Sequence, residues 1–263
     1  MGSSWISYRY DGSFEGFLCC VFDSFYRRED PAAILDAQEK QALLFPEHLV
    51  KTDPAHAQRV FASLRQRISP QAADLVTLGF LTCAPDRELL LLQFIRLGFR
   101  CGRPVTDMLG DGTVCRLTRA VSQACHEAHL FTGFVRFSEY DGKLAAVITP
   151  KNRVLPLVSA HFCGRYPEES FLIYDRTHQE ALLYHPHEAA ILPLAHFSLP
   201  APGAAEARFR GLWQRFYTAV AIEGRLNPKC RQAHMPKRYW EDLTEFQESG
   251  AAKSAPFLDL PRG

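Results

Sequence analysis

Residues 133–186 read GFVRFSEYDGKLAAVITPKNRVLPLVSAHFCGRYPEESFLIYDRTHQEALLYHP, and this stretch predicts the centre of the fold. Asp141-Gly142 separates the β-rich runs FVRFSEY and LAAVI, which is typical of a hairpin because both turn positions need a positive φ. A second hairpin pairs FLIYD with EALLY across residues 176–179. Between the hairpins, VLPLVSAHFCGR has apolar residues at helical spacing. We therefore expect a small, mostly antiparallel sheet with a helix on one face and its other face left for the rest of the chain.

The composition is that of an ordinary globular protein. The 263 residues are enough for one or two domains, and 47% of them are hydrophobic against 22% charged. Lys and Arg number 30 and Asp and Glu 29, so no global charge attracts nucleic acid or a membrane, although a local basic patch is compatible with this balance. No apolar run approaches the roughly 20 residues of a membrane-spanning helix.

The cysteine pattern favours a reducing compartment. None of the eight cysteines lies in a CxxC pair, most lie in apolar runs, and no basic-then-apolar signal segment opens the chain. We expect reduced, buried thiols in a cytoplasmic protein.

The first half of the chain predicts a short strand and then mainly helices. The strand ends at Tyr10, and Ser13 can cap the helix that follows. Residues 31–52 read as a loop with one strand expected in residues 42–50. Asp53-Pro54 and Ser69-Pro70 each supply an N-cap and a first-turn proline, and residues 53–131 predict a helical subdomain.

The end of the chain predicts one more strand, a linker and a helix. The strand is expected within residues 188–194 and the linker at residues 198–205. Residues 204–225 predict an amphipathic helix, and residues 249–263 read as a loose tail. The side chains expected on the buried side of this helix are Phe209, Leu212, Trp213, Phe216 and Val220.

Together these elements predict an α+β protein in two parts. Residues 1–132 form an N-terminal region with a short strand and a mainly helical subdomain. Residues 133–263 form an α+β domain with two β-hairpins, a central helix and a C-terminal helix.

No motif for a cofactor or a metal is complete. The sequence has no Gly-rich phosphate loop, nucleophile elbow or His-Glu-x-x-His helix, so no cofactor is predicted. Cys125, His126 and His129 supply only part of a ligand set, because no second close pair of ligands exists to complete it.

Two residues of the central stretch are candidate catalytic groups. Asp175 ends the apolar strand FLIYD, where its carboxylate can act as a base. His161 lies in the helix between the hairpins and can form an acid/base pair with Asp175. The alternatives are a turn residue bonded to its own backbone for Asp175 and a structural histidine for His161.

Cationic and aromatic residues predict a nucleic-acid surface. Lys151 and Arg153 precede the central helix, where basic groups and backbone N–H groups suit a phosphate. Lys237-Arg238-Tyr239-Trp240 interleaves cations with rings, as single-strand binders do, although a segment that docks its rings into the sheet would look the same. The full predicted set is Lys151, Arg153, Arg165, Arg176, Lys237, Arg238, Tyr239 and Trp240.

Several motifs resemble the bacterial "probable DNA metabolism protein" family, which ends in a domain of unknown function. The resemblance rests on residues 10–16 (YDGSFEG), 154–157 (VLPL), His161-Phe162 with Arg165, Asp175, and residues 235–240 (MPKRYW), and it covers nearly the whole chain. It implies DNA repair or modification beside a radical-SAM partner protein, and it supplies no catalytic residues. The chain lacks a CxxxCxxC motif, so it is not itself expected to be the radical enzyme.

Three hypotheses remain open on the sequence. The first is a DNA-binding protein, for single-stranded or damaged DNA, that acts with the radical-SAM partner. The second is an enzyme that acts on a damaged or modified base, with Asp175 and His161 as acid/base groups and Tyr239 or Trp240 stacking on the base. The third is a protein-interaction scaffold that binds the partner without nucleic acid.

Overall fold

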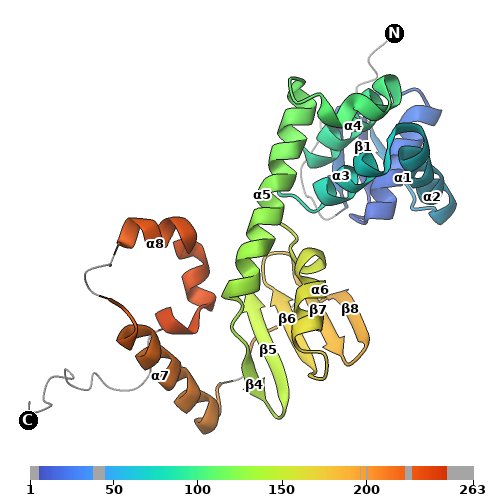
Figure 1. Ribbon diagram of the computed structural model, residues 1–263. Helices are drawn as coiled ribbons and strands as arrows, with labels where there is room; N and C mark the ends of the chain where they lie inside the picture. The colour runs from blue at the N-terminus through green and yellow to red at the C-terminus, as the bar shows by residue number, and fades with distance from the viewer. Residues whose placement is uncertain (1–5, 38–44, 196, 200, 223–226, 248–263) are drawn as a thin grey trace, which may run out of the picture. The chain divides into compact units, whose positions relative to one another are not determined.

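The computed structural model describes residues 6–37, 45–195, 197–199, 201–222 and 227–247 (Figure 1). The chain divides into two compact units. The N-terminal unit comprises residues 1–129 with 151–154, and the C-terminal unit comprises residues 130–150 with 155–263. Helices and two small sheets make this an α+β protein, as the sequence predicted.

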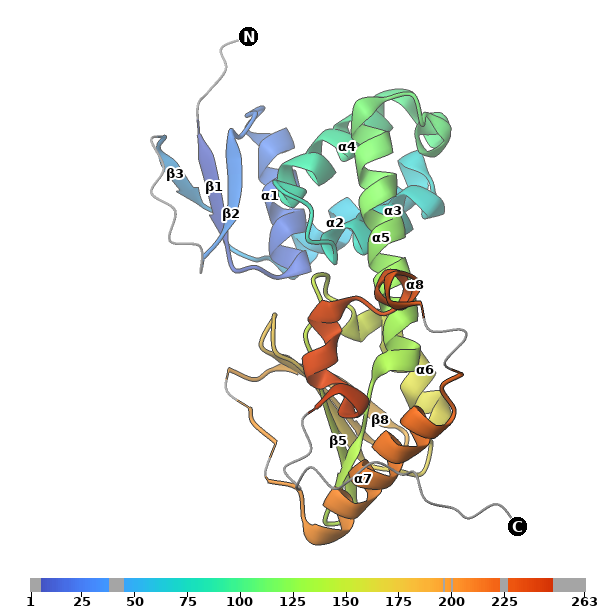
Figure 2. The same ribbon diagram turned by 90° about the vertical axis from the view of Figure 1, so that its left-hand side faces the viewer.

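The N-terminal unit contains a three-stranded parallel sheet. Strands β1 (Ser7–Tyr10), β2 (Ala33–Asp36) and β3 (Glu47–Leu49) lie in the order β2-β1-β3, with α1 (Phe14–Tyr26) next to them (Figure 2). The segment 31–52, which was predicted as a loop with one strand, contains two strands. β3 lies within the strand expected at residues 42–50, whereas β2 was not expected. Residues 42–44 of that expected strand lie outside the described ranges. A strand of three or four residues is too short to show a clear alternation of apolar and polar side chains in the sequence. Parallel pairing in addition depends on contacts distant in sequence.

The helices predicted from residue 53 onward are present, and they share one core with β1 and α1. This segment contains α2 (Pro54–Ser63), a π-helical turn η1 (Leu64–Ile68), α3 (Pro70–Phe80), α4 (Arg87–Cys101), a 3-10 turn η2 (Arg103–Asp107) and α5 (Gly112–Phe134). The predicted caps are present: Asp53 accepts hydrogen bonds from Ala55 N and His56 N, and Ser69 accepts one from Ala72 N. The core is apolar, as helix packing requires, with fully buried Phe17, Leu64, Leu91, Phe94, Ile95 and Leu117.

The C-terminal unit is built on a five-stranded mixed sheet. Its strands are β4 (Ser138–Tyr140), β5 (Lys143–Ile148), β6 (Phe171–Asp175), β7 (Glu180–His185) and β8 (Glu188–Pro193), side by side in chain order. Both hairpins are confirmed, and β5 and β6 are parallel because α6 (Leu155–Arg165) forms the crossover between them.

The hairpin turns follow the predicted chemistry. Asp141 and Gly142 have φ values of 49° and 76°, as a two-residue hairpin turn requires. The first strand is shorter than predicted, because α5 continues to Phe134 and delays the start of β4. The additional strand expected after the second hairpin is present as β8.

One face of this sheet is covered by α6. Val158 and Phe162 of the helix are buried, and Phe137 packs edge-on against both Phe162 and Phe171. Figure 1 shows α6 lying against the strands of this sheet.

The C-terminal helix α7 (Ala204–Ala219) is present, but the expectation about its buried side was wrong. Its five predicted core side chains are all exposed, Phe209 at 68% and Phe216 at 56%. The opposite, polar side contacts the unit: Arg210 donates to Ser138 Oγ at 2.5 Å and Gln214 to the Thr244 carbonyl at 2.8 Å. Helical spacing identifies the residues that share a face, but tertiary contacts decide which face lies inside.

The chain continues in short helices, α8 (Pro228–His234) and the 3-10 helices η4 (Lys237–Asp242) and η5 (Thr244–Phe246). The predicted tail at residues 249–263 lies outside the described residues. None of the helices in the described ranges combines the length and apolar character needed to cross a membrane.

The cysteines differ from expectation. Cys19 and Cys20 are buried, Cys163 is half-buried, and all eight thiols are free. The remaining five are exposed: Cys83, Cys101, Cys115, Cys125 and Cys230. The expectation of buried thiols was wrong for these five. Four of them lie on helices, which have outward as well as inward positions, and Cys83 lies in the loop after α3.

Candidate nucleic-acid interface

Asp175 is a buried turn residue whose partner is His178. Its Oδ1 accepts hydrogen bonds from Thr177 N at 2.9 Å and His178 N at 3.1 Å, and its Oδ2 lies 2.6 Å from His178 Nδ1. These contacts organise the turn between β6 and β7, as an Asp at a turn start commonly does. The pairing of Asp175 with His161 was therefore wrong, because turn residues already engage both carboxylate oxygens. His161 is exposed on α6, with its ring edge-on to Phe162.

Arg176 connects this turn to η4. Its guanidinium lies 3.2 Å from Glu241 and 3.5 Å from Asp242, and Thr149 Oγ1 donates to Asp242 at 2.7 Å. Thr149 follows β5 and Arg176 follows β6, so the ends of the two parallel strands meet η4 at one edge of the sheet. Burial raises the pKa of Asp242 above its usual range, although Thr149 and Arg176 act in the opposite direction.

Tyr239 belongs to the core of the C-terminal unit. Its buried ring packs 4.8 Å from the ring of Phe131 and 5.8 Å from that of Phe134. The Arg238 guanidinium lies over the same ring at 4.4 Å and donates to the Tyr239 hydroxyl. A ring buried in this way offers no free face to a base, so the structure does not support the stacking role expected for Tyr239.

Trp240 forms a cation–aromatic cluster with Arg231, Lys237 and Phe246. The rings of Trp240 and Phe246 stack 4.3 Å apart at 14°, and the Trp240 Nε1 donates to the Met235 carbonyl at 3.0 Å. The Arg231 guanidinium lies 5.1 Å from the Trp240 ring and the Lys237 ammonium 5.9 Å from it. Both cations are exposed, and neither forms an ion pair with a carboxylate of the described residues.

Arg231 and Phe246 are members of this cluster that the sequence analysis missed. Arg231 lies in α8, four residues before the MPKRYW motif begins at Met235, and Phe246 follows the motif in η5. The only signal was the closeness of these residues to MPKRYW in the chain. The turns that bring them onto one indole ring come from tertiary packing.

Lys151 and Arg153 lie in the N-terminal unit, in a segment that binds a carboxylate of the protein itself. The backbone N of Lys151 and of Asn152 donate to Glu127, at 3.1 and 2.8 Å, and Arg153 N donates to the Leu81 carbonyl at 2.9 Å. Glu127 is buried in α5. The amides of Lys151 and Asn152 therefore already have an anionic partner, while the Lys151 side chain is exposed.

The predicted site residues thus fall into three places. Asp175, Arg176 and the four residues from Lys237 to Trp240 meet at or beside η4. His161 and Arg165 lie on the exposed surface of α6, where the Arg165 guanidinium is 5.8 Å from the Tyr166 ring. Lys151 and Arg153 belong to the other unit.

The cysteine–histidine motif of α5 does not form a metal site in the described part of the chain. No three His, Cys, Asp or Glu side chains among those residues are placed to hold a metal ion, and this includes Cys125, His126 and His129.

The fold and these contacts define an α+β protein with an exposed cation–aromatic cluster in its C-terminal unit. Residues 85–245 match the family described as a domain of unknown function, DUF4130, and the chain therefore belongs to the DUF4130 family. The match includes the five-stranded sheet and most of the cluster, up to η5. Comparisons with curated proteins and with solved structures gave no match.

Proposed function

We propose that this protein binds DNA through the cation–aromatic cluster and acts in DNA repair or modification beside a radical-SAM partner enzyme. The observation that carries the proposal is the pair of exposed cations, Arg231 and Lys237, held at one indole ring without a carboxylate partner among the described residues. Cations at an aromatic face are attracted to the ring, and they neutralise phosphates without the cost of breaking an internal ion pair.

The role in repair or modification rests on the resemblance to the "probable DNA metabolism protein" family. Lys237 and Trp240 of the cluster belong to the MPKRYW motif that carries this resemblance. The resemblance also supplies the radical-SAM partner, which would provide the iron–sulfur chemistry that this chain has no CxxxCxxC motif to support.

The cluster favours contact with phosphates over recognition of bases. One face of the Trp240 ring is covered by Phe246, which leaves less aromatic surface for a base to stack on. We therefore expect binding that depends little on sequence and weakens steeply with salt.

The test is fluorescence anisotropy with labelled single-stranded and duplex oligonucleotides at several salt concentrations. Reversal of both cluster cations, R231E with K237E, should weaken binding at least about tenfold and reduce the salt slope by about 2, because each lost phosphate contact removes about one unit. The matched control is R59E with R67E, which reverses two exposed arginines of the N-terminal unit and changes the net charge equally.

Two outcomes would contradict this proposal. Equal losses in the cluster variant and the control would show that only net charge matters. Absence of DNA binding by the wild-type chain at low salt would reject DNA as its ligand.

A single R165E variant shows separately whether the exposed end of α6 contributes to DNA binding.

A second candidate function is a scaffold that binds the partner protein without DNA. The exposed apolar face of α7 favours it, because a contiguous apolar helix face commonly marks a protein interaction site. Co-purification with the radical-SAM protein after nuclease treatment, abolished by F216K and unaffected by R231E with K237E, would support the scaffold in place of the DNA-binding role.

A further inference from the structure

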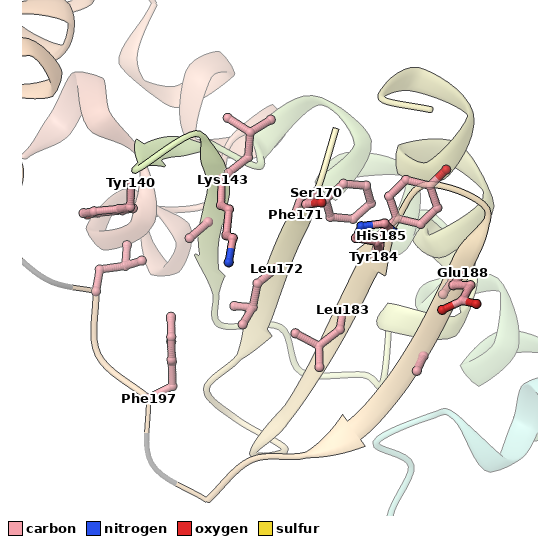
Figure 3. A pocket seen from close by; sticks show the side chains of 15 residues that line it. Tyr140, Lys143, Ser170, Phe171, Leu172, Leu183, Tyr184, His185, Glu188 and Phe197 are labelled. Atoms are coloured by element: carbon pink, nitrogen blue, oxygen red, sulfur yellow. The ribbon is translucent and has the colours of Figure 1, made fainter. Parts of the chain in front are cut away.

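The face of the five-stranded sheet that α6 does not cover contains a cavity. Its volume is about 690 Å³, and it extends over β5, β6, β7 and β8. This volume lies within the range of sites that hold small organic ligands. Figure 3 shows the side chains of Leu172 and Leu183 on neighbouring strands of this face, with Lys143 and Phe197 on one side of them and Glu188 on the other.

The floor of the cavity is an apolar row across four strands. Ala145, Leu172, Leu183 and Ala190 are successive partners in the strand register. Their sequence neighbours Phe171 and Tyr184 stack on each other at 4.8 Å, and Phe171 packs against Phe137 beneath α6. Because successive side chains of a strand alternate between faces, the floor residues point away from α6, and Leu183 is 38% exposed.

A polar row borders this floor at one end. Tyr140 pairs with Lys143, and His185 pairs with Glu188. Ser170 lies between them, since its carbonyl accepts a hydrogen bond from Leu144 N at 3.0 Å. All five residues line the cavity, and four of them can donate a hydrogen bond from the side chain.

The charges of the polar row are separated. Lys143 and Glu188 lie on strands with two others between them, so their Cα atoms are roughly 14 Å apart. Both side chains are exposed, and neither forms an ion pair with another described residue. The wall residue Phe197 lies beside the Lys143 end in Figure 3, and its ring packs 5.3 Å from that of Tyr174. The β5 side of the cavity therefore carries a cation and the β8 side a carboxylate.

We infer that this cavity is a binding site for a small amphipathic carboxylate. The apolar body of the ligand lies on the row from Ala145 to Ala190 against Phe197, and its carboxylate accepts hydrogen bonds from the Lys143 ammonium. Glu188 repels the reverse orientation, because a carboxylate at that end would face a like charge. The inference does not depend on DNA binding, since the cavity shares no residue with the cation–aromatic cluster.

The test is isothermal titration calorimetry of the full chain with decanoate and with decanol, both below the concentrations at which they aggregate. Wild-type protein should bind decanoate more tightly than decanol. The K143Q variant should lose about tenfold in decanoate affinity, the usual effect of a hydrogen bond to a charged group, and keep its affinity for decanol. The L183D variant should lose both ligands.

Matched controls separate this site from other apolar surfaces. The L192D variant changes another exposed leucine of the same sheet that does not line the cavity, and K51Q removes an exposed lysine of the N-terminal unit. Both should bind like the wild type, with folding checked by circular dichroism. No heat with decanoate, an equal effect of K143Q on both ligands, or an equal effect of L192D and L183D would each overturn the inference.

Discussion

The carboxylate of Glu127 accepts a hydrogen bond from Asn152 Nδ2 at 2.6 Å, and Asn152 Oδ1 accepts one from Cys83 N at 2.9 Å. The two residues are 25 positions apart and both are buried. This relay joins α5 to the loop after α3 by way of residues 151–154. It explains why this short segment belongs to the N-terminal unit although the chain on both sides of it belongs to the other.

Removal of the Glu127 carboxylate should destabilise the fold. The E127A variant leaves three donors, two of them from Asn152, without their acceptor, and we expect it to lose about 2–4 kcal/mol in the free energy of unfolding. E127Q, which keeps one acceptor oxygen, should lose less. Urea denaturation measures both, with E168A at an exposed position as the control. A loss in E127A no larger than in E168A would contradict the relay.

Asp175 should contribute to stability through the β6–β7 turn. The D175A variant removes the acceptor for two backbone amides and the partner of His178, so we expect a loss of about 2 kcal/mol. H161A, at an exposed position of α6, should change stability by less than about 0.5 kcal/mol. Thermal or urea unfolding of the two variants compares them directly, and similar losses in both would indicate that the residues act together after all.

Glu245 should make part of the stability dependent on pH. Burial by itself raises the pKa of Glu245, but hydrogen bonds from Arg136 and Trp213 outweigh burial and hold this pKa below its usual range. The folded state therefore binds this proton less readily than the unfolded state. The contribution is complete above the ordinary Glu pKa of about 4.3 and is lost as the pH falls through the lowered value.

The comparison of wild type with E245Q measures this contribution. At pH 7 the variant should be less stable by about 2 kcal/mol, because the hydrogen bonds from Arg136 lose their charged acceptor. The difference should shrink below about pH 4, where the wild-type carboxyl is protonated as well. Urea denaturation between pH 3 and 7 follows it, and a difference that stays constant with pH would exclude this role for Glu245.

Substitutions in α7 should reduce stability on its polar face, which contacts the C-terminal unit, and have little effect on its exposed apolar face. F216K changes an exposed ring and should alter the free energy of unfolding by less than about 0.5 kcal/mol. Q214A removes donors to the Thr244 and Gln247 carbonyls and should lose about 1–2 kcal/mol. Chemical denaturation ranks the two variants. The opposite order would mean that the apolar face is buried in solution, for example between two copies of the chain.

Local chemistry accounts for what the sequence predicted correctly. The caps at Asp53 and Ser69 and the Asp141-Gly142 turn need only neighbouring residues, so they were predictable from a few positions each. The same applies to the two hairpins and to α6, whose patterns run over enough residues to be read.

The candidate site was predicted less completely, because contacts distant in sequence decide it. The MPKRYW motif was identified from its cationic and aromatic side chains. The motif itself does not show that Tyr239 is buried against Phe131 or that Lys237 is exposed. Arg231 became part of the cluster only through the path of the chain from α8 to η4.

By itself, the sequence of this protein determined the elements that depend on near neighbours: the helices with their caps, the two hairpin turns and the α+β class. Only the tertiary structure decided which face of each element lies inside. In the folded chain Asp175 is buried and contacts His178, and the apolar side of α7 is exposed. The face of the central sheet opposite α6 contains a cavity. Periodicity specifies which side chains share a face, whereas burial depends on the surfaces that meet it from distant parts of the chain.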